Sequence, residues 1–295
     1  MKTIRIACCL IASLPAPAQD PEKPLTPQAA LAEMFDKFEK AGITVDVAKQ
    51  TVTVKAEVGR PDQPLEFLLI HRRGKAHEAL FVCEAKASLL NAAMIVIGLE
   101  KGKNARIVDK DPLPTIEEIE KGAPLSDVFP PEGEPLFITA AWKDAAGKEV
   151  EYAIGDLLID MTTGFMVMDE SWIYLGGHMA PMYRGEPPVF VGDYEGNLVS
   201  VVYKTPPNHL VTMRHERAAD DQIWWFSKVV PEPETPVTVT FHKEKPPVVA
   251  AFEKRIVEQW KEEQQKRKQA EEAERKKDGG KDGGGAGSPG GTGRE

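Results

Sequence analysis

The chain has 295 residues, of which 42% are apolar and 28% are charged, and its formal net charge is −9. The apolar fraction excludes a fully disordered chain, and the absence of an uninterrupted apolar run long enough to cross a bilayer excludes a transmembrane helix. The acidic balance also disfavours nucleic acid as a partner, because neutralising phosphates requires clustered lysines and arginines.

The N-terminal segment, residues 1–18, is typical of a signal peptide. Lys2 and Arg5 supply positive charge, residues 6–14 are a short apolar stretch, and the Ala-Pro-Ala that follows offers the small side chains that a signal peptidase reads. We therefore expect cleavage before Gln19 and an exported protein, either periplasmic or extracellular. An ordinary cytosolic N-terminus is the alternative.

Cysteine usage limits the chemistry of the exported chain. Cleavage removes Lys2 and Arg5, so the formal charge falls from −9 to −11, and it leaves Cys83 as the last cysteine. Lipidation at Cys8 or Cys9 is disfavoured by the charge of Arg5. One cysteine excludes an internal disulfide, an iron–sulfur cluster and a cysteine-based zinc site. Cys83 ends an apolar run and is expected to be a buried thiol.

The first part of the mature chain predicts one helix and one hairpin. Residues 19–42 are a leader arm that contains a short amphipathic helix at about 28–41, because its apolar residues recur at helical spacing. Residues 43–47 and 51–54 are alternating β-branched runs, which favour a β-hairpin.

A second hairpin and a second helix are expected next. Residues 65–70 are almost wholly apolar and suit a buried strand, which a turn at 72–75 connects to a returning partner at 78–82. Three- and four-residue apolar spacing then predicts a buried helix at about 86–98. The proline-rich, acidic segment 103–134 predicts a long loop with at most one helical turn.

The strand pattern resumes after residue 134, in runs at 136–142, 149–154, 166–168, 172–175, 189–191, 198–203, 223–230 and 237–241. Strands in series with few helices indicate an α+β domain over residues 43–247, built on a mainly antiparallel β-sheet with two or three packed helices.

A long charged helix is predicted at 248–277. Its first three turns carry an apolar stripe that ends at Trp260, whereas the remainder has few apolar residues and is supported by oppositely charged pairs four residues apart. The a/d pattern is too short for a coiled coil. Residues 253–277 carry nine basic and seven acidic side chains, so this helix is a possible contact with the cell envelope or with a protein partner. Residues 278–295 are expected to be a disordered glycine-rich tail.

Several short motifs, in order along the chain, resemble the YdjY-like domain family. They comprise Leu65-Glu66-Phe67-Leu68-Leu69, His77 to Val82, Ile97-Gly98-Leu99-Glu100-Lys101-Gly102, Trp142-Lys143-Asp144, Trp172 to Gly176, Asp193-Tyr194-Glu195-Gly196 and Thr235 to Val239. The resemblance covers roughly 43–242. It implies a bacterial extracytoplasmic domain whose biochemical role is not established. The chain departs from the family pattern at Gly177, where a small hydroxyl residue is expected, and it adds the charged helix and the tail.

Histidines and carboxylates suggest one weak metal site. His71 and His77 flank the predicted turn, and with Glu78 they would offer two imidazoles and a carboxylate to a divalent metal. Neighbouring side chains on a strand point to opposite faces, which argues against a shared ligand for His77 and Glu78. No zinc-protease helix, serine-hydrolase elbow or nucleotide-binding loop is present. We therefore expect no metal and no other cofactor.

Aromatic side chains and one loop histidine give the remaining binding candidates. Trp172 and Tyr174 lie on a predicted strand, and His178 follows two glycines that let the chain approach a ligand closely. On the strand that contains residues 224–226, alternation places Trp225 opposite Trp224 and Phe226, so one of the two faces is a possible stacking platform for a sugar or a peptide.

The sequence favours a non-catalytic binding or structural module with no assigned catalytic residue. The first alternative is a metal-assisted hydrolase that uses His71, His77, Glu78 and His178. The second alternative is an envelope-associated interaction protein that acts through the C-terminal helix. The ligand, the partner and the oligomeric state do not follow from the sequence.

Overall fold

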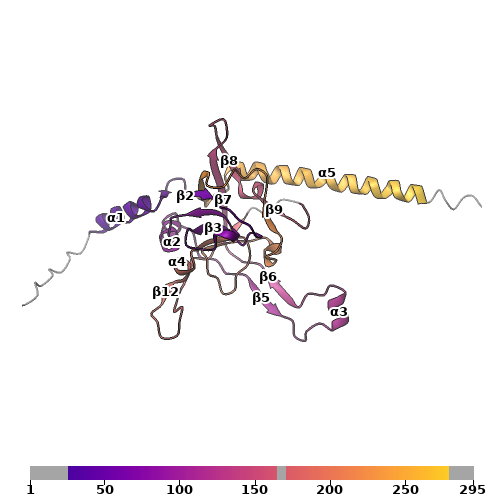
Figure 1. Ribbon diagram of the computed structural model, residues 1–295, viewed down its shortest axis with the longest axis horizontal. Coiled ribbons are helices and arrows are strands. Elements are labelled where there is room, and N and C mark those ends of the chain that lie inside the picture. Colours follow the sequence, from indigo (N-terminus) through magenta and orange to yellow (C-terminus); the bar gives the residue numbers. More distant parts are fainter. Residues whose placement is uncertain (1–25, 165–170, 279–295) are drawn as a thin grey trace, which may run out of the picture.

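The computed structural model describes residues 26–164 and 171–278 (Figure 1). In chain order the elements are α1 (Pro27–Lys40), β1 (Ile43–Asp46), β2 (Thr51–Val58), β3 (Phe67–His71), η1 (Ala76–Glu78), β4 (Ala79–Cys83), α2 (Ala87–Val96), β5 (Arg106–Asp109), α3 (Ile116–Glu120), β6 (Ser126–Phe129), β7 (Pro135–Lys143), β8 (Glu149–Ala153), η2 (Ile154–Asp156), β9 (Leu158–Asp160), β10 (Trp172–Tyr174), β11 (Met179–Ala180), β12 (Val189–Phe190), α4 (Val191–Glu195), β13 (Asn197–Ser200), β14 (Val211–Met213), η3 (Glu216–Ala219), β15 (Trp224–Phe226), β16 (Pro236–His242) and α5 (Pro247–Asp278). The predicted signal peptide, the predicted strand at 166–168 and the tail after Asp278 lie outside the described residues.

Eight strands close into a β-barrel. They follow one another in the order β2, β16, β7, β10, β14, β13, β3 and β4, and β4 pairs again with β2. Two further strands, β1 and β8, pair with β2 and β7. The prediction of an α+β domain on a mainly antiparallel sheet with packed helices is therefore wrong, because the sheet curls until its ends meet.

Strand β2 explains how the barrel closes. One of its edges pairs with β16 from Thr51 to Glu57. Its other edge is shared, since Thr51 to Val54 pair with β1 and Ala56 to Val58 pair with β4. Hairpin signals in a sequence report only which neighbouring runs pair, so the β2–β4 pairing has no local signal.

Strands β3 and β4 correct a second prediction. The turn after His71 was expected to make a hairpin, but the two strands are parallel, with Phe67 opposite Ala79 and His71 opposite Cys83. Residues 72–78 carry the chain back along β3 in seven residues, where parallel strands usually need about a dozen. Gly74 permits this tight path, because a Cβ there would lie 3.0 Å from the carbonyl oxygen of Gly196. Strands β13 and β14 are also parallel.

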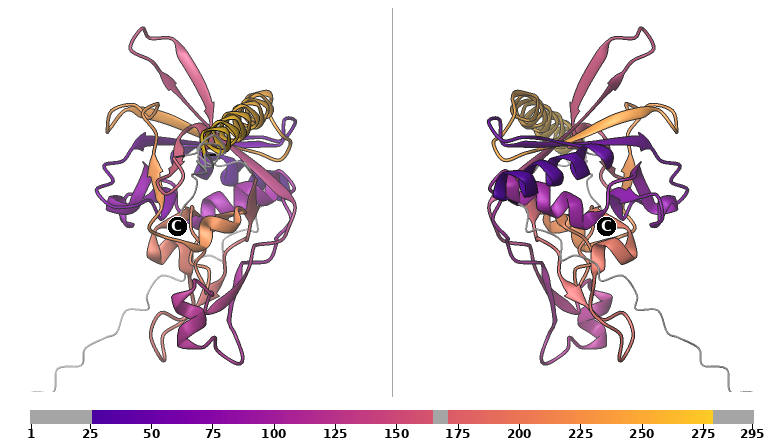
Figure 2. Two further views of the ribbon diagram at one scale, coloured as in Figure 1. Left: turned by 90° about the vertical axis from the view of Figure 1, so that its right-hand side faces the viewer. Right: turned by 90° about the vertical axis from the view of Figure 1, so that its left-hand side faces the viewer.

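The core fills the barrel and extends under the helices. Leu69, Phe81 and Trp224 are almost completely buried in it. Helix α2, predicted at about 86–98, packs its apolar face on the same core, and α1 lies beside α2 (Figure 2). Burying a large apolar side chain contributes roughly 1.5–3 kcal/mol, so this core is the main source of stability.

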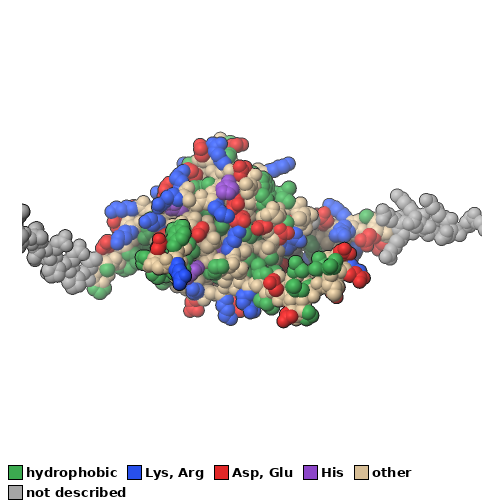
Figure 3. Space-filling model, turned by 60° about the horizontal axis from the view of Figure 1, so that its bottom comes forward, with side chains coloured by type: hydrophobic (Ala, Val, Ile, Leu, Met, Phe, Trp, Pro, Cys, Tyr) green, Lys and Arg blue, Asp and Glu red, His purple; other side chains and the backbone are tan. Residues whose placement is uncertain are grey.

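Segment 103–134 forms a projecting arm in place of the predicted long loop. Strands β5 and β6 pair with each other, and α3 lies at the tip, where Thr115 and Glu118 make a capping box. Figure 3 shows apolar side chains gathered on the lower face, where the arm lies. Those that the arm exposes are Ile107, Val108, Leu113, Ile116, Ile119, Leu125, Val128 and Phe129.

Helix α5 docks on the body only at its start. Val249, Phe252 and Ile256 pack with Phe137 and Ala153 in a separate apolar cluster. The helix then leaves the body and projects away from it (Figure 1). Among the residues that the structure describes, no helix has the length and apolar character needed to cross a bilayer.

Candidate functional site

The parallel course of β3 and β4 separates the two histidines of the predicted metal site. His71 ends β3, and its Nδ1 accepts a hydrogen bond from the amide of Arg73. His77 lies in η1, beyond the opposite end of β3, about 16 Å away for a five-residue strand. Over residues 26–164 and 171–278, no group of three histidine, cysteine or acidic side chains is placed to hold a metal ion.

The predicted aromatic residues of β10 are part of the core. Trp172 is 2% exposed and Tyr174 is 3% exposed, so neither offers a surface to a ligand. The hydroxyl of Tyr174 donates to Asn91 at 2.7 Å, and burial raises the pKa of Tyr174 to about 12. His178 is half-buried, and its carbonyl accepts the amide of Val191.

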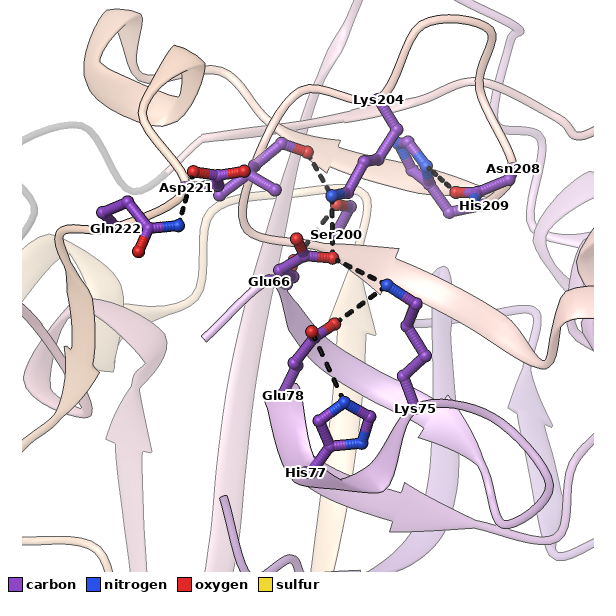
Figure 4. Close-up of polar contacts among 11 residues, drawn as sticks. Glu66, Lys75, His77, Glu78, Ser200, Lys204, Asn208, His209, Asp221 and Gln222 are labelled. Carbon is purple, nitrogen blue, oxygen red and sulfur yellow. Dashed lines mark hydrogen bonds and ion pairs between the residues drawn. The ribbon is translucent and has the colours of Figure 1, made fainter. Parts of the chain in front are cut away.

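Of the predicted site residues, His77 and Glu78 do lie together in the structure. They lie among charged residues that the sequence analysis did not identify as candidates. Figure 4 shows Glu66, Lys75, His77, Glu78 and Lys204 meeting beside η1, and we call these five residues the polar cluster. His77 and Glu78 lie on a 3₁₀ turn and not on a strand, so His77 Nε2 reaches to 3.5 Å from Glu78 Oε1.

Two lysines compensate the two carboxylates of the polar cluster. Lys204 Nζ lies 2.7 Å from Glu66 Oε2, and Lys75 Nζ lies 3.4 Å from the same oxygen and 3.1 Å from Glu78 Oε2. Each glutamate side chain is only 14% exposed. The charges of the two lysines and the two glutamates sum to zero.

Burial and charge oppose each other at Glu66. Burial alone would raise the pKa of Glu66, but the hydrogen bond and the positive charge of Lys204 outweigh it, so the net pKa lies below the usual value of a glutamate. Burial would likewise lower the pKa of Lys75, but Glu78 and Glu66 hold it above its usual value. Both groups are therefore fixed in their charged forms at neutral pH.

His209 lies beside Lys204 and is fully buried. Burial, together with the charge of Lys204, lowers the pKa of His209 to about 3, so the imidazole is neutral. Its Nδ1 lies 3.2 Å from the side-chain oxygen of Asn208, which only accepts, and this assigns the proton to Nδ1. Nε2 has no hydrogen-bond partner among the described residues.

The hydroxyl of Ser200 beside the polar cluster is engaged, and the Cys83 thiol at the far end of β4 is buried. Ser200 Oγ lies 2.6 Å from the carbonyl of Val202 and 3.1 Å from that of Glu66. Burial raises the pKa of the Cys83 thiol to about 12, far above the range of a reactive thiolate.

An open cavity is lined in part by residues 58–62, which precede Glu66 along the chain. It has a volume of about 480 Å³, and we call it the Phe226 pocket. It is lined by Val58, Gly59, Arg60, Pro61, Asp62, Leu80, Phe226, Val230, Pro231, Glu232 and Pro233. Small-molecule sites are typically cavities of about 300–1,000 Å³ with mostly apolar walls.

Backbone hydrogen bonds fix the walls of the Phe226 pocket. Gly59 donates to Leu80, Asp62 donates to His77, and Val58 exchanges bonds with the loop that precedes β16. Gly59 is needed at the exit from β2, because a Cβ there would lie 2.6 Å from the carbonyl oxygen of Ala79. The pocket therefore lies between two loops, residues 59–62 and 230–233, and hydrogen bonds tie the neighbouring chain to the barrel strands.

The aromatic run of β15 contributes one wall. Trp224 is core, whereas Trp225 is half-buried and stacks on Phe226 with ring centroids 5.4 Å apart. The predicted separate faces for Trp225 and Phe226 are not observed, but Phe226 does line a cavity.

Sequence reasoning missed most of this region for one reason. Glu66 lies within an otherwise apolar run, and Lys204, the cation closest to it, is remote in sequence. A single carboxylate inside the run Leu65–Ile70 is the signal that was available, since a buried charge needs a partner.

Comparison with known proteins confirms the resemblance drawn from the sequence. A family model described as the YdjY domain matches residues 43–242, which include the barrel, the polar cluster and the Phe226 pocket. No curated protein and no solved structure matches the chain. The match spans more than half of the chain, and the chain therefore belongs to the YdjY domain family.

Proposed function

We propose that this YdjY-domain protein is an exported, non-catalytic binding module whose ligand site is the Phe226 pocket. The observation that carries the proposal is the cavity of about 480 Å³, whose lining of mostly apolar residues lies between two loops bonded to the barrel strands. Pre-formed apolar cavities with a few polar groups at the rim are the usual form of ligand sites.

The charge balance of the polar cluster supports a binding role over a catalytic one. A general acid or base needs a pKa near the working pH. Glu66 is shifted below its usual pKa and Lys75 above it, so both move away from neutrality.

The proposal is tested by filling the pocket. Val230→Trp places a large ring in the cavity, whereas Val229→Trp adds the same ring at an exposed neighbour outside the lining. The neutral apolar fluorophore N-phenyl-1-naphthylamine is titrated into each protein. We expect binding to the wild type and to Val229→Trp, and its loss in Val230→Trp. Equal binding by both variants would refute the pocket as the ligand site.

Export is proposed from the N-terminal sequence alone. The positive start, the apolar stretch and the small residues before Gln19 support cleavage at that point. Intact mass of the protein recovered from a periplasmic extract should match a chain that begins at Gln19. A full-length mass in the cytosolic fraction would count against export.

Helix α5 supports a second proposal, attachment to the envelope or to a protein partner. Its apolar stripe continues to Trp260, which is 46% exposed where the helix leaves the body. Removing residues 260–295 keeps the docked turns, which end at Ile256, and deletes Trp260 together with the projecting part. Loss of the protein from the envelope fraction is expected, and unchanged retention would remove this proposal.

A further inference from the structure

We propose that the Phe226 pocket takes an organic ammonium ion, a ligand in which a positively charged amine is joined to an apolar body. This inference rests on the proposed function and adds the chemical class of the ligand. It is carried by the charges at the rim, by the scarcity of hydrogen-bond donors in the walls, and by the aromatic ring inside.

The rim carries uncompensated negative charge. Arg60 and Glu234 form an ion pair, with 3.1 Å between Nη2 and Oε1, so the one cation of the lining is already engaged. Asp62 and Glu232 remain as two exposed carboxylates on the lining. An ammonium group held between them would be attracted by both, and the net charge of −9 on the whole chain favours the approach of a cation.

The walls are poor in the donors that an anion needs. Pro61, Pro231 and Pro233 have no amide hydrogen. The amides of Val58, Gly59, Asp62 and Val230 already donate to protein carbonyls. A carboxylate or phosphate entering the pocket would lose water and would have to compete with Glu234 for the guanidinium of Arg60, the one charged donor of the lining, which is costly for an ion.

The apolar part of the lining accepts the rest of the ligand. Val230 offers aliphatic surface and Phe226 offers a ring, both half-buried, whereas Val58 and Leu80 are buried behind them. An aromatic ring face also attracts a cation placed over it. The pocket thus matches an apolar body inside and an ammonium group at the mouth.

Three probes of similar size test the charge requirement on the full-length chain at pH 7. They are 4-phenylbutylammonium, the neutral 4-phenylbutan-1-ol and the anionic 4-phenylbutanoate, each titrated by calorimetry. We expect the ammonium to bind at least fivefold more tightly than the alcohol, and the carboxylate to bind most weakly.

A charge-neutralising double variant and a matched control test whether the preference for the ammonium arises from the carboxylates of the pocket lining. Asp62→Asn combined with Glu232→Gln should bring the ammonium to the affinity of the alcohol. Glu120→Gln combined with Glu149→Gln removes the same charge from α3 and β8, away from the lining, and should keep the fivefold preference. Equal loss in both double variants would assign the preference to net charge and overturn the inference.

Failure of the inference and failure of the proposed function are distinguishable. Equal affinity for the ammonium and the alcohol, with both lost in Val230→Trp, overturns the ammonium preference and leaves the pocket as a binding site. Absence of binding by all three probes overturns both. The affinities of acetyl-Phe-Lys-amide and acetyl-Phe-Gln-amide are then compared, to test whether a lysine side chain of a peptide can supply the ammonium. Equal affinity of the two peptides would restrict the ligand to free amines.

Discussion

The Phe226 pocket and the polar cluster share one connecting segment, which gives residues 59–62 to the pocket and Glu66 to the cluster, yet they differ in what they leave open. In the polar cluster, Glu66 and Glu78 are matched by two lysines, and little of either carboxylate reaches solvent. In the Phe226 pocket, volume is unfilled and two carboxylates are uncompensated. Both regions are rich in charge, but only the second has capacity for a ligand.

On this barrel, unfilled volume and uncompensated charge distinguish a ligand site from a structural cluster of charges. A group of titratable residues attracts attention in a sequence, but mutual compensation makes such a group structural. A site needs unused interactions and space for a ligand. The comparison therefore predicts that changes in the polar cluster act on stability, whereas changes in the pocket act on binding.

The largest effect is expected from Lys204→Met. It leaves Glu66 without its closest cation in a setting that is only 14% exposed, so we expect a loss of about 2–3 kcal/mol in the free energy of unfolding. Urea unfolding at pH 7 measures it. The control is Lys103→Met, which breaks an exposed pair with Glu132 and should cost less than about 1 kcal/mol.

The stability that Lys204→Met loses should depend on pH in a defined direction. Because the folded-state pKa of Glu66 is lowered, its stabilising contribution is present above the unfolded-state pKa and is lost as pH falls through the folded-state pKa. The difference in the free energy of unfolding between the wild type and Lys204→Met should therefore become smaller on acidification. A difference that grows below pH 4 would contradict this assignment.

His209→Leu tests the buried imidazole beside the polar cluster. Its pKa is about 3 when folded and 6.5 in the reference state, so the unfolded chain takes up a proton between these values and the folded chain does not. The free energy of unfolding of the wild type should fall, relative to the variant, by at most about 1.4 kcal/mol for each pH unit below 6.5. Unfolding curves at pH 7, 6 and 5 measure the difference. A constant difference across this range would show that His209 is protonated in the folded state.

The smallest effect on stability is expected from Arg60→Met at the pocket. Its pair with Glu234 has both side chains 70% exposed, so the free energy of unfolding should change by less than about 1 kcal/mol. The variant removes the one cation of the lining, so the affinity for 4-phenylbutylammonium should rise about twofold by lost repulsion. Weaker binding of the ammonium would mean that Arg60 itself contacts the ligand.

Local features of the fold were predictable, and non-local ones were not. The hairpin of β1 and β2, helix α2 and the docking stripe of α5 follow from spacing within one segment. Barrel closure depends on the pairing of β2 with β4. Strands β3 and β4 are parallel, although the turn between them predicts an antiparallel hairpin. Neither has a periodic signature in the sequence.

The candidate site was hidden for the same reason. The lysine closest to Glu66 is Lys204, and the wall of the pocket brings Val58 and Leu80 together with Phe226 and Val230. Only the tertiary fold joins these segments. The family resemblance covers all of them, but it carries no information on which side chains meet.

The claim that ligands enter the Phe226 pocket and not the polar cluster is tested most directly by NMR mapping. Spectra of the isotope-labelled chain are recorded during titration with 4-phenylbutylammonium. The methyl groups of Val230 and the ring protons of Phe226 should shift together and saturate at one concentration. Saturable shifts centred on the side chains of Lys75 and Lys204, with those signals unchanged, would contradict the account.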